Sequence, residues 1–160
     1  MHARAAWRLK RLGFERVYRY APGKADWLAA GLPTQGPGSQ TLRAGAVARR
    51  DVPTCHLDER LGEVRDRVKA AGWDACVVVN TERVVLGLLR ARELDRDPAL
   101  RIEQAMRPGP STFRPYIAIE KLLEVMTDHG QDNLPITTSD GRLVGLVTRA
   151  GATGAAMLDA

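Results

Sequence analysis

The side chains with the most reactive chemistry in this sequence are two cysteines and three histidines, and their spacing matches no common reactive site. Cys55 and Cys76 form no Cys-x-x-Cys pair and follow no secretion signal, so we expect reduced thiols in a cytoplasmic protein. His2, His56 and His129 lie far apart, whereas a zinc site needs a cluster of ligands. We therefore predict no metal site.

Acidic and basic groups gather at one place, where Asp128 and His129 stand close to Asp132. Such a group could transfer protons, but it falls at the predicted end of a helix, where a histidine is favourable simply as a C-terminal charge. Neither common type of glycine-rich nucleotide loop occurs in the chain. We predict no catalytic residues and a protein that is not an enzyme.

The elements that position these residues come from an internal repeat with an offset of 58 positions. Sliding the chain by this offset needs no gap and superposes like residues: Thr54 on Thr112, Gly72 on Gly130, Asp74 on Asp132, Gly87 on Gly145 and Leu88 on Leu146. The second repeat also places Ser139-Asp140-Gly141 between two apolar runs, which is a strong β-hairpin signal.

Each repeat is predicted to run strand, helix, strand, strand, helix. The strands are expected at 52–56, 75–79 and 84–89, and again at 111–114, 133–137 and 142–147. The helices between them have apolar residues at spacings of three and four: Leu61, Val64 and Val68, then Ile119, Leu122 and Met126. Gly72 and Gly130 are the expected C-caps, the final helices begin near Ala91 and Arg149, and residues 102–106 form a short helix between the repeats.

A single repeat of this size buries too little apolar area to be stable alone. We therefore expect the two repeats to pack sheet to sheet around a pseudo-twofold axis, with a cleft on each side of that axis where ligands would bind. The core should be aliphatic, since 44% of the residues are apolar and only 5% are aromatic.

The positive charge avoids the repeat. Residues 1–50 carry 10 Lys and Arg against 2 acidic residues, whereas residues 51–160 carry 14 against 17. This distribution is weak evidence for a phosphate-backbone footprint, so nucleic acid is not an expected partner. No apolar run reaches the length of about 18 residues that a membrane helix needs, so no membrane partner is expected.

The repeat resembles the tandem cystathionine-β-synthase-type (CBS) domain pair, also called a Bateman module. The resemblance rests on ACVVVNTERVVLGLLRARE, on NLPITTSDGRLVGLVTRAG and on MRPGP between them. It implies an α+β fold of two β-α-β-β-α repeats with pseudo-twofold symmetry, which we assign to residues 42–103 and 104–160. It also implies a homodimer whose clefts hold an adenosine-type ligand such as AMP, ADP, ATP or S-adenosylmethionine.

The binding pattern of this family is a glycine, two apolar residues, Ser or Thr, two residues and Asp. The hydroxyl receives a phosphate and the carboxylate takes both ribose hydroxyls. Here the pattern is split, because Arg90 and Glu93 stand at the hydroxyl and acid positions of the first repeat, whereas the second has Thr148 but Gly151 in place of the acid. The missing carboxylate removes two hydrogen bonds of about 1.5 to 3 kcal/mol each, so the second cleft is the poorer candidate.

The preferred ligand site is the first cleft, where Arg90 and Arg92 can hold phosphate as guanidiniums. Its assigned residues are Thr54, Cys55, Cys76, Val77, Val78, Arg90 and Glu93. The weaker second cleft is assigned to Thr112, Leu134, Pro135 and Thr148. Structural roles stay open for all of them: strand packing, a solvated helix start for Arg90 and Glu93, and a cap and core for the second set.

Residues 1–33 resemble the C-terminal end of a rhodanese-type sulfurtransferase domain, on the segments AAWRLKRLGFERVYRY and GKADWLAAGLP. The pattern predicts an α-β-α fragment with a helix over 3–12 ended by Gly13, a strand over 14–20 and a helix over 25–30, followed by a linker over 34–41. The nucleophilic cysteine of that family precedes this segment, and here no cysteine precedes Cys55. We interpret the fragment as a non-catalytic remnant or the product of a misplaced start codon.

Three functions remain open at this point. The leading hypothesis is a non-enzymatic regulatory module that binds an adenosine-type ligand in an inter-repeat cleft. The second is an interaction or dimerisation module with vestigial clefts. The third is a truncated fusion of rhodanese and CBS domains that lacks its catalytic cysteine and would have to carry a persulfide on Cys55 or Cys76.

Overall fold

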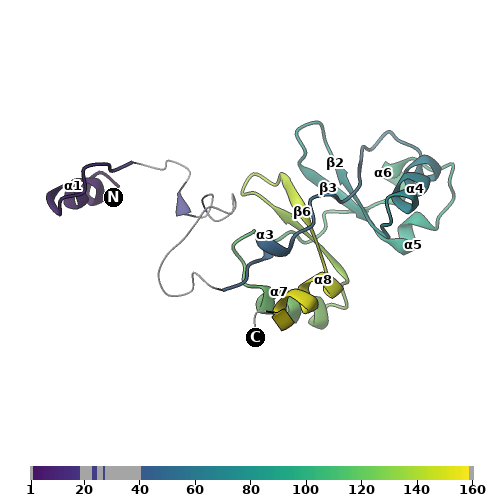
Figure 1. Ribbon diagram of the computed structural model, residues 1–160. Coiled ribbons are helices and arrows are strands. Elements are labelled where there is room, and N and C mark those ends of the chain that lie inside the picture. Colours follow the sequence, from purple (N-terminus) through teal and green to yellow (C-terminus); the bar gives the residue numbers. More distant parts are fainter. Residues whose placement is uncertain (1, 19–22, 25–26, 28–40, 159–160) are drawn as a thin grey trace.

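The computed structural model describes residues 2–18, 23–24, 27 and 41–158 of the chain. Helix α1 (His2–Arg11) stands apart from the repeats in Figure 1. It confirms the helix predicted over residues 3–12, and Gly13 follows it with a φ of +93°, a conformation that ends helices. Within the described residues, no helix has the length and apolar character to cross a membrane.

The strand predicted over residues 14–20 is wrong for residues 14–18, which belong to no strand. An alternating pattern forms a strand only where a partner strand pairs with it, and Phe14 and Tyr18 are instead exposed. Residues 19–20 lie outside the described residues, as does the helix predicted over 25–30 apart from Trp27.

The two repeats share their helices and their central β-hairpins in the same order (Figure 1), but their short first strands, β1 and β4, lie at positions that are not equivalent under the offset of 58. The first comprises α3 (Ala44–Val47), β1 (Thr54–Cys55), α4 (Leu61–Ala70), β2 (Cys76–Val79), β3 (Val85–Leu89) and α5 (Ala91–Leu94). The second comprises α6 (Ile102–Ala105), β4 (Arg107–Pro108), α7 (Ile119–Asp128), β5 (Asn133–Thr137), β6 (Leu143–Thr148) and α8 (Arg149–Leu158). Both ends of α4 and α7 differ by the 58 positions of the sequence repeat, and so do both ends of α3 and α6.

The central helices form where their apolar stripes can be buried. The stripes predicted on α4 and α7 are fully buried: Leu61, Val64 and Val68 on the first, and Ile119, Leu122 and Met126 on the second. Gly72 and Gly130 end the two helices with φ values of +70° and +58°. Only glycine adopts this conformation without a steric penalty, so both predicted C-caps are confirmed.

The sheet of each repeat is completed by the N-terminal segment of the other repeat. We call this the leading segment: it contains Arg49 in the first repeat and Arg107 in the second. The first sheet has the order β1-β2-β3-β4, and β4 belongs in sequence to the second repeat. In the second sheet, β5 and β6 pair with each other, Phe113 bridges to Ile136, and Arg49 bridges to Leu146. Arg49 and Leu146 exchange two backbone hydrogen bonds of 2.9 Å, at positions equivalent to the Arg107 and Leu88 pair of the first sheet.

The hairpin tips of the two repeats also pair with each other. The Val85 N–H donates to the carbonyl of Gly141 (3.1 Å), and the Leu143 N–H donates to the carbonyl of Arg83 (2.9 Å). Val85 and Leu143 are equivalent under the 58-position offset, and so are Arg83 and Gly141. The two bonds are therefore equivalent to each other, as a pseudo-twofold relation requires. The hairpin predicted at Asp140-Gly141 is confirmed, with a φ of +83° at the glycine. Leu143 and Leu146 join the core of the first repeat, so the two halves share buried surface.

Candidate functional site

The strand residues predicted for the first cleft lie in the core of the first repeat. Cys55, Cys76, Val77 and Val78 are at most 1% exposed and pack in one hydrophobic cluster, while Thr54 is half-buried and pairs with Val77. None of the four buried side chains lines the cavities described below. Any role for them in ligand binding would therefore be to form the packed floor beneath a ligand.

The Cys55 thiol does not have the properties of a nucleophile. Both cysteines are free and buried, and hydrogen bonding to Cys76, followed by burial, raises the pKa of the Cys55 thiol far above its ordinary value. A thiol that stays protonated cannot form the thiolate on which persulfide transfer depends. The sulfurtransferase hypothesis thus receives no support from the geometry of Cys55.

The first cleft is a cavity of about 560 Å³ at the start of α5, beside the segment that joins α6 to β4. Its lining residues are Arg92, Glu93, Arg96, Ala105, Met106, Arg107 and Pro108. Arg90 stands directly before α5 but does not line this cavity, and burial, followed by the charge of Arg107, lowers the pKa of its guanidinium. Like charges therefore meet at this cavity.

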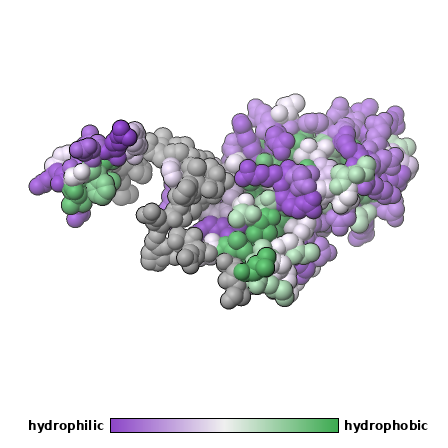
Figure 2. Space-filling view, in the orientation of Figure 1, coloured by the Kyte–Doolittle hydropathy of each residue, from purple (hydrophilic) through white to green (hydrophobic). Residues whose placement is uncertain are grey.

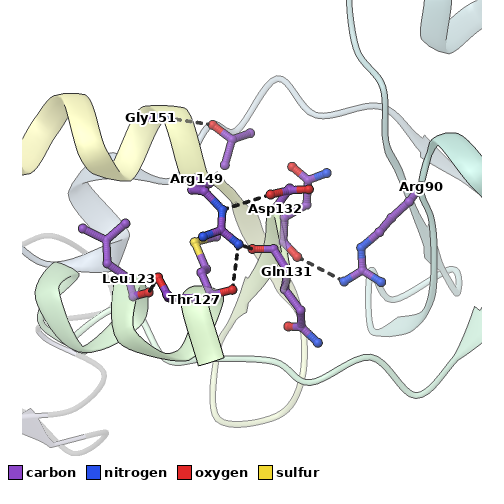
Figure 3. A network of polar contacts seen from close by, with 10 residues as sticks. Arg90, Leu123, Thr127, Gln131, Asp132, Arg149 and Gly151 are labelled. Carbon is purple, nitrogen blue, oxygen red and sulfur yellow. Dashed lines mark hydrogen bonds and ion pairs between the residues drawn. The ribbon is translucent and has the colours of Figure 1, made fainter. Parts of the chain in front are cut away.

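Two of the predicted first-cleft residues are held by local contacts. The backbone N–H of Arg90 donates to Oε2 of Glu93 (3.0 Å), and this bond caps α5. The Arg90 side chain crosses to the other repeat, where Nη2 donates to the Asn133 carbonyl (3.3 Å; Figure 3), while its buried Nε has no partner. The structure thus brings Arg90 and Glu93 into contact through the cap of α5, while only Glu93 lines the cavity.

The second cleft is a cavity of about 620 Å³ between the repeats. The first repeat contributes Arg49, Gly72, Trp73 and Asp74, and the second contributes Asp132, Asn133, Thr148, Arg149 and Ala150. Of the residues predicted for this cleft, Thr148 lines the cavity, Leu134 and Pro135 are buried, and Thr112 is exposed. The Thr148 hydroxyl accepts a hydrogen bond from the Gly151 N–H (3.1 Å), so it also caps α8.

Arg149 holds the ends of α7 and α8 together beside the second cleft (Figure 3). Its Nε donates to Oδ1 of Asp132 (2.9 Å), and its Nη2 donates to the carbonyls of Met126 (2.7 Å) and Gln131 (2.9 Å). These bonds join the start of α8 to the last turn of α7 and to the segment that follows it. The wall of this cleft is therefore fixed by a guanidinium whose charge is already paired.

Sequence reasoning missed the arginines that the leading segments bring to each cleft. Arg49 forms a bidentate ion pair with Asp51 (3.1 and 2.6 Å) and lies over the Trp73 ring, 4.1 Å from its centroid. Its equivalent in the first cleft is Arg107, 58 positions later. The equivalence of Arg49 and Arg107 can be read from the repeat offset. Only the structure shows that each arginine pairs with a strand of the other repeat and so lines a cleft there.

Comparison with known proteins agrees with this geometry. The family model of the CBS domain matches the chain twice, over residues 44–97 and 102–154. The chain belongs to the CBS-domain family. CBS pairs are generally regulatory domains and not enzymes, and residues 44–154 form such a pair. The match does not include residues 1–33, so the rhodanese-like interpretation of that fragment gains no support from it.

Similar proteins share the repeat pair. An uncharacterized protein of Methanopyrus kandleri is 30% identical over 120 residues, which are 68% of this chain and 60% of that protein. The chain therefore spans less than two thirds of the length of this relative. Among solved structures, the cytosolic domain of the Mg²⁺ channel MgtE in complex with ATP has a TM-score of 0.65 at 24% identity, over 71% of this chain and 48% of the other.

A second similar structure is the CBS domain pair of protein MJ0100 in complex with 5′-methylthioadenosine and S-adenosylmethionine. It has a TM-score of 0.68 at 13% identity, over 75% of this chain and 99% of the other. At identities of 24% and 13%, these two structures show that the CBS pair of this chain has the same fold, and they do not identify its ligand.

Proposed function

We propose that this CBS pair is a regulatory module that binds an adenosine-type ligand, from the group AMP, ADP, ATP and S-adenosylmethionine, in an inter-repeat cleft. The observation that carries the proposal is the presence of two cavities of about 560 and 620 Å³, one at the start of α5 and one at the start of α8. These starts are equivalent under the repeat, and both volumes suit a nucleotide-sized ligand.

The chemistry of the first cleft supports it as the main site. Arg90 and Arg92 offer guanidiniums to phosphate, and Glu93 can accept a ribose hydroxyl with the carboxylate oxygen that does not cap α5. Thr54, Cys55, Cys76, Val77 and Val78 would support the base from below as packed strands. The second cleft, with Thr112, Leu134, Pro135 and Thr148, would bind more weakly because Gly151 provides no carboxylate.

Related structures support the class of ligand. The MgtE cytosolic domain is in complex with ATP, and the MJ0100 pair with 5′-methylthioadenosine and S-adenosylmethionine. A ligand that contacts residues of both repeats favours the arrangement of the repeats that it fits best. Regulation of a partner would follow from this difference in affinity between arrangements.

Isothermal titration of the full chain with AMP, ADP, ATP and S-adenosylmethionine tests the proposal. We expect at least one of them to bind with a micromolar Kd, and Glu93→Ala to weaken it roughly tenfold through the loss of a charged hydrogen bond. Arg142→Ala, which changes a surface ion pair with Asp140, is the control. The absence of binding below millimolar concentration would favour the interaction module with vestigial clefts.

Three narrower predictions accompany this proposal. A homodimer is consistent with the apolar surface over α8 in Figure 2, where Met157 and Leu158 are 76% and 91% exposed. Sedimentation equilibrium would measure the oligomeric state.

The rhodanese-like fragment over 1–33 would be tested by looking for an in-frame cysteine loop in the upstream DNA. The cytoplasmic location would be tested by cell fractionation.

A further inference from the structure

Three arginines line the first cleft, and within the described residues none of them forms an ion pair. They are Arg92, Arg96 and Arg107, and Arg90 stands directly before α5, which contributes Arg92 and Glu93 to the lining. Glu93 is the only acidic residue in the lining, and one of its oxygens is engaged by the Arg90 backbone. The cleft therefore carries a marked excess of positive charge.

The internal repeat provides a residue-by-residue comparison for this cluster. The equivalents of Arg90, Arg92 and Arg96 in the second repeat are Thr148, Ala150 and Gly154, none of which is charged. The equivalent of Arg107 is Arg49, and its charge is balanced by Asp51 at 2.6 Å. The two cavities thus have similar volumes but different charge: two arginines and two aspartates line the second, whereas three arginines and one glutamate line the first. The arginine cluster is therefore not a general consequence of the fold.

The contacts of the cluster leave donors available for a ligand. Arg96 Nη1 donates to the carbonyls of Gln104 (3.0 Å) and Ala105 (3.2 Å), which fixes its guanidinium against the end of α6. Arg90 is anchored by one bond to Asn133 and has a buried Nε without a partner. Positive charges that line one cavity repel one another, and a ligand with several negative charges would reduce this repulsion.

We infer that the first cleft selects ligands with a di- or triphosphate group, whereas a single phosphate would leave much of the cluster unpaired. The inference rests on the proposed adenosine-type function for the identity of the ligand's other end, but the phosphate preference rests on the arginines alone. The group recognised is a chain of phosphates, carried either by a nucleoside or by inorganic polyphosphate.

The test is a titration series on the full chain without Mg²⁺, using adenosine, AMP, ADP, ATP and inorganic triphosphate. We expect ATP to bind at least tenfold more tightly than AMP. In the Arg92→Ala/Arg107→Ala variant, ATP affinity should fall by roughly 100-fold, about tenfold for each lost charged contact. The Arg8→Ala/Lys10→Ala variant removes the same two charges from exposed positions on α1 and should bind ATP as the parent chain does.

The outcomes separate this inference from the proposed function. Equal affinities for AMP and ATP would overturn the phosphate preference and leave the adenosine-type function standing. Tight binding of inorganic triphosphate, with no binding of adenosine or AMP, would support the preference and contradict the adenosine-type function. An ATP affinity that falls equally in both double variants would show a general charge effect, and would overturn the assignment to this cleft.

Discussion

Arg49 and Arg107 occupy equivalent positions in the two repeats and have different neighbours. Arg49 pairs with Asp51 and stacks on Trp73. The residues equivalent to these two partners, on the side of Arg107, are Gly109 and Gln131. Hydrogen bonding to Arg49 lowers the pKa of the Asp51 carboxyl. The carboxylate therefore stays charged as the pH falls toward its ordinary pKa, and it neutralises Arg49 throughout the neutral range.

The missing acid of the second cleft suggests a gain of function. In the Gly151→Asp variant, the new carboxylate would stand at the family's ribose position, beside the Thr148 hydroxyl that now bonds to the Gly151 N–H. Two charged hydrogen bonds to a ribose diol are worth a few kcal/mol, so we expect adenosine to bind at least tenfold more tightly. Isothermal titration measures this change.

Gly154→Asp provides the matched control for that variant. It adds the same charge to the same helix, at a glycine whose added Cβ would meet no neighbouring atom within 4 Å. If it raises adenosine affinity as much as Gly151→Asp does, the carboxylate acts through general charge and the ribose role is wrong.

At the scale of elements, the glycine at the start of the binding motif, Gly87 or Gly145, has a packing function. A Cβ on Gly145 would lie 2.6 Å from the Arg49 carbonyl oxygen, and a Cβ on Gly87 would lie 2.3 Å from the Met106 sulfur. In both repeats the glycine thus lets the exchanged leading segment approach the strand. The atom nearest to an added Cβ belongs to rigid backbone at Gly145 and to a flexible side chain at Gly87.

We therefore expect Gly145→Ala to destabilise the fold more than Gly87→Ala. The backbone clash at Gly145 should cost about 1 to 3 kcal/mol, while the Met106 thioether can move aside at lower cost. Urea unfolding followed by circular dichroism measures both values. Gly154→Ala, in open space on α8, should instead stabilise by about 0.4 to 1 kcal/mol. Equal losses at the two strand glycines would contradict this account.

Arg149 is the main polar link between α7 and α8. Replacing it with alanine removes three bonds, two of them to carbonyls at the end of α7, and we expect a loss of about 1 to 3 kcal/mol in the free energy of unfolding. The comparison variant is Arg142→Ala, whose ion pair with Asp140 is more than half exposed and should contribute under about 1 kcal/mol. A similar small loss for both would show that Arg149 acts only as a surface charge.

The elements of the repeats could be predicted because their signals are local. The apolar stripes at Leu61 and Ile119, the glycine C-caps and the Asp140-Gly141 turn each act within one helix or hairpin. The pairing of Arg49 with Leu146 could not be predicted, since it joins residues almost 100 positions apart and depends on the packing of whole repeats. The alternation over Phe14–Tyr18 failed for the related reason that no strand pairs with it.

The candidate site was predicted only in part, for a similar reason. Arg90, Glu93 and Thr148 were found because they stand within one short motif at a helix start. The strand residues Val77 and Val78 were assigned by the same pattern, but their side chains are buried in the core. Arg92 also lies in the motif, whereas Arg96 and Arg107 come from the turn after α5 and from β4, which the motif does not include.

At the scale of the whole molecule, the shared core predicts that the two repeats unfold together. Leu143 and Leu146 of β6 pack in the core of the first repeat, and the hairpin tips exchange backbone hydrogen bonds. We expect the amides of Leu88 and Leu146 to show the same free energy of opening in native-state hydrogen exchange. A difference of more than about 1 kcal/mol between them would indicate two independent folding units.

The exchange of leading segments gives the connection over residues 98–101 a particular meaning. If the polypeptide were cut there, each product would keep the segment that completes the other's sheet and would lack the one that completes its own. The halves are thus related like the protomers of a segment-swapped dimer, joined in this protein by a covalent tether. An ancestor with one repeat could have filled both sheets only by associating with a second identical chain, and duplication would have made that association permanent while freeing the two clefts to diverge.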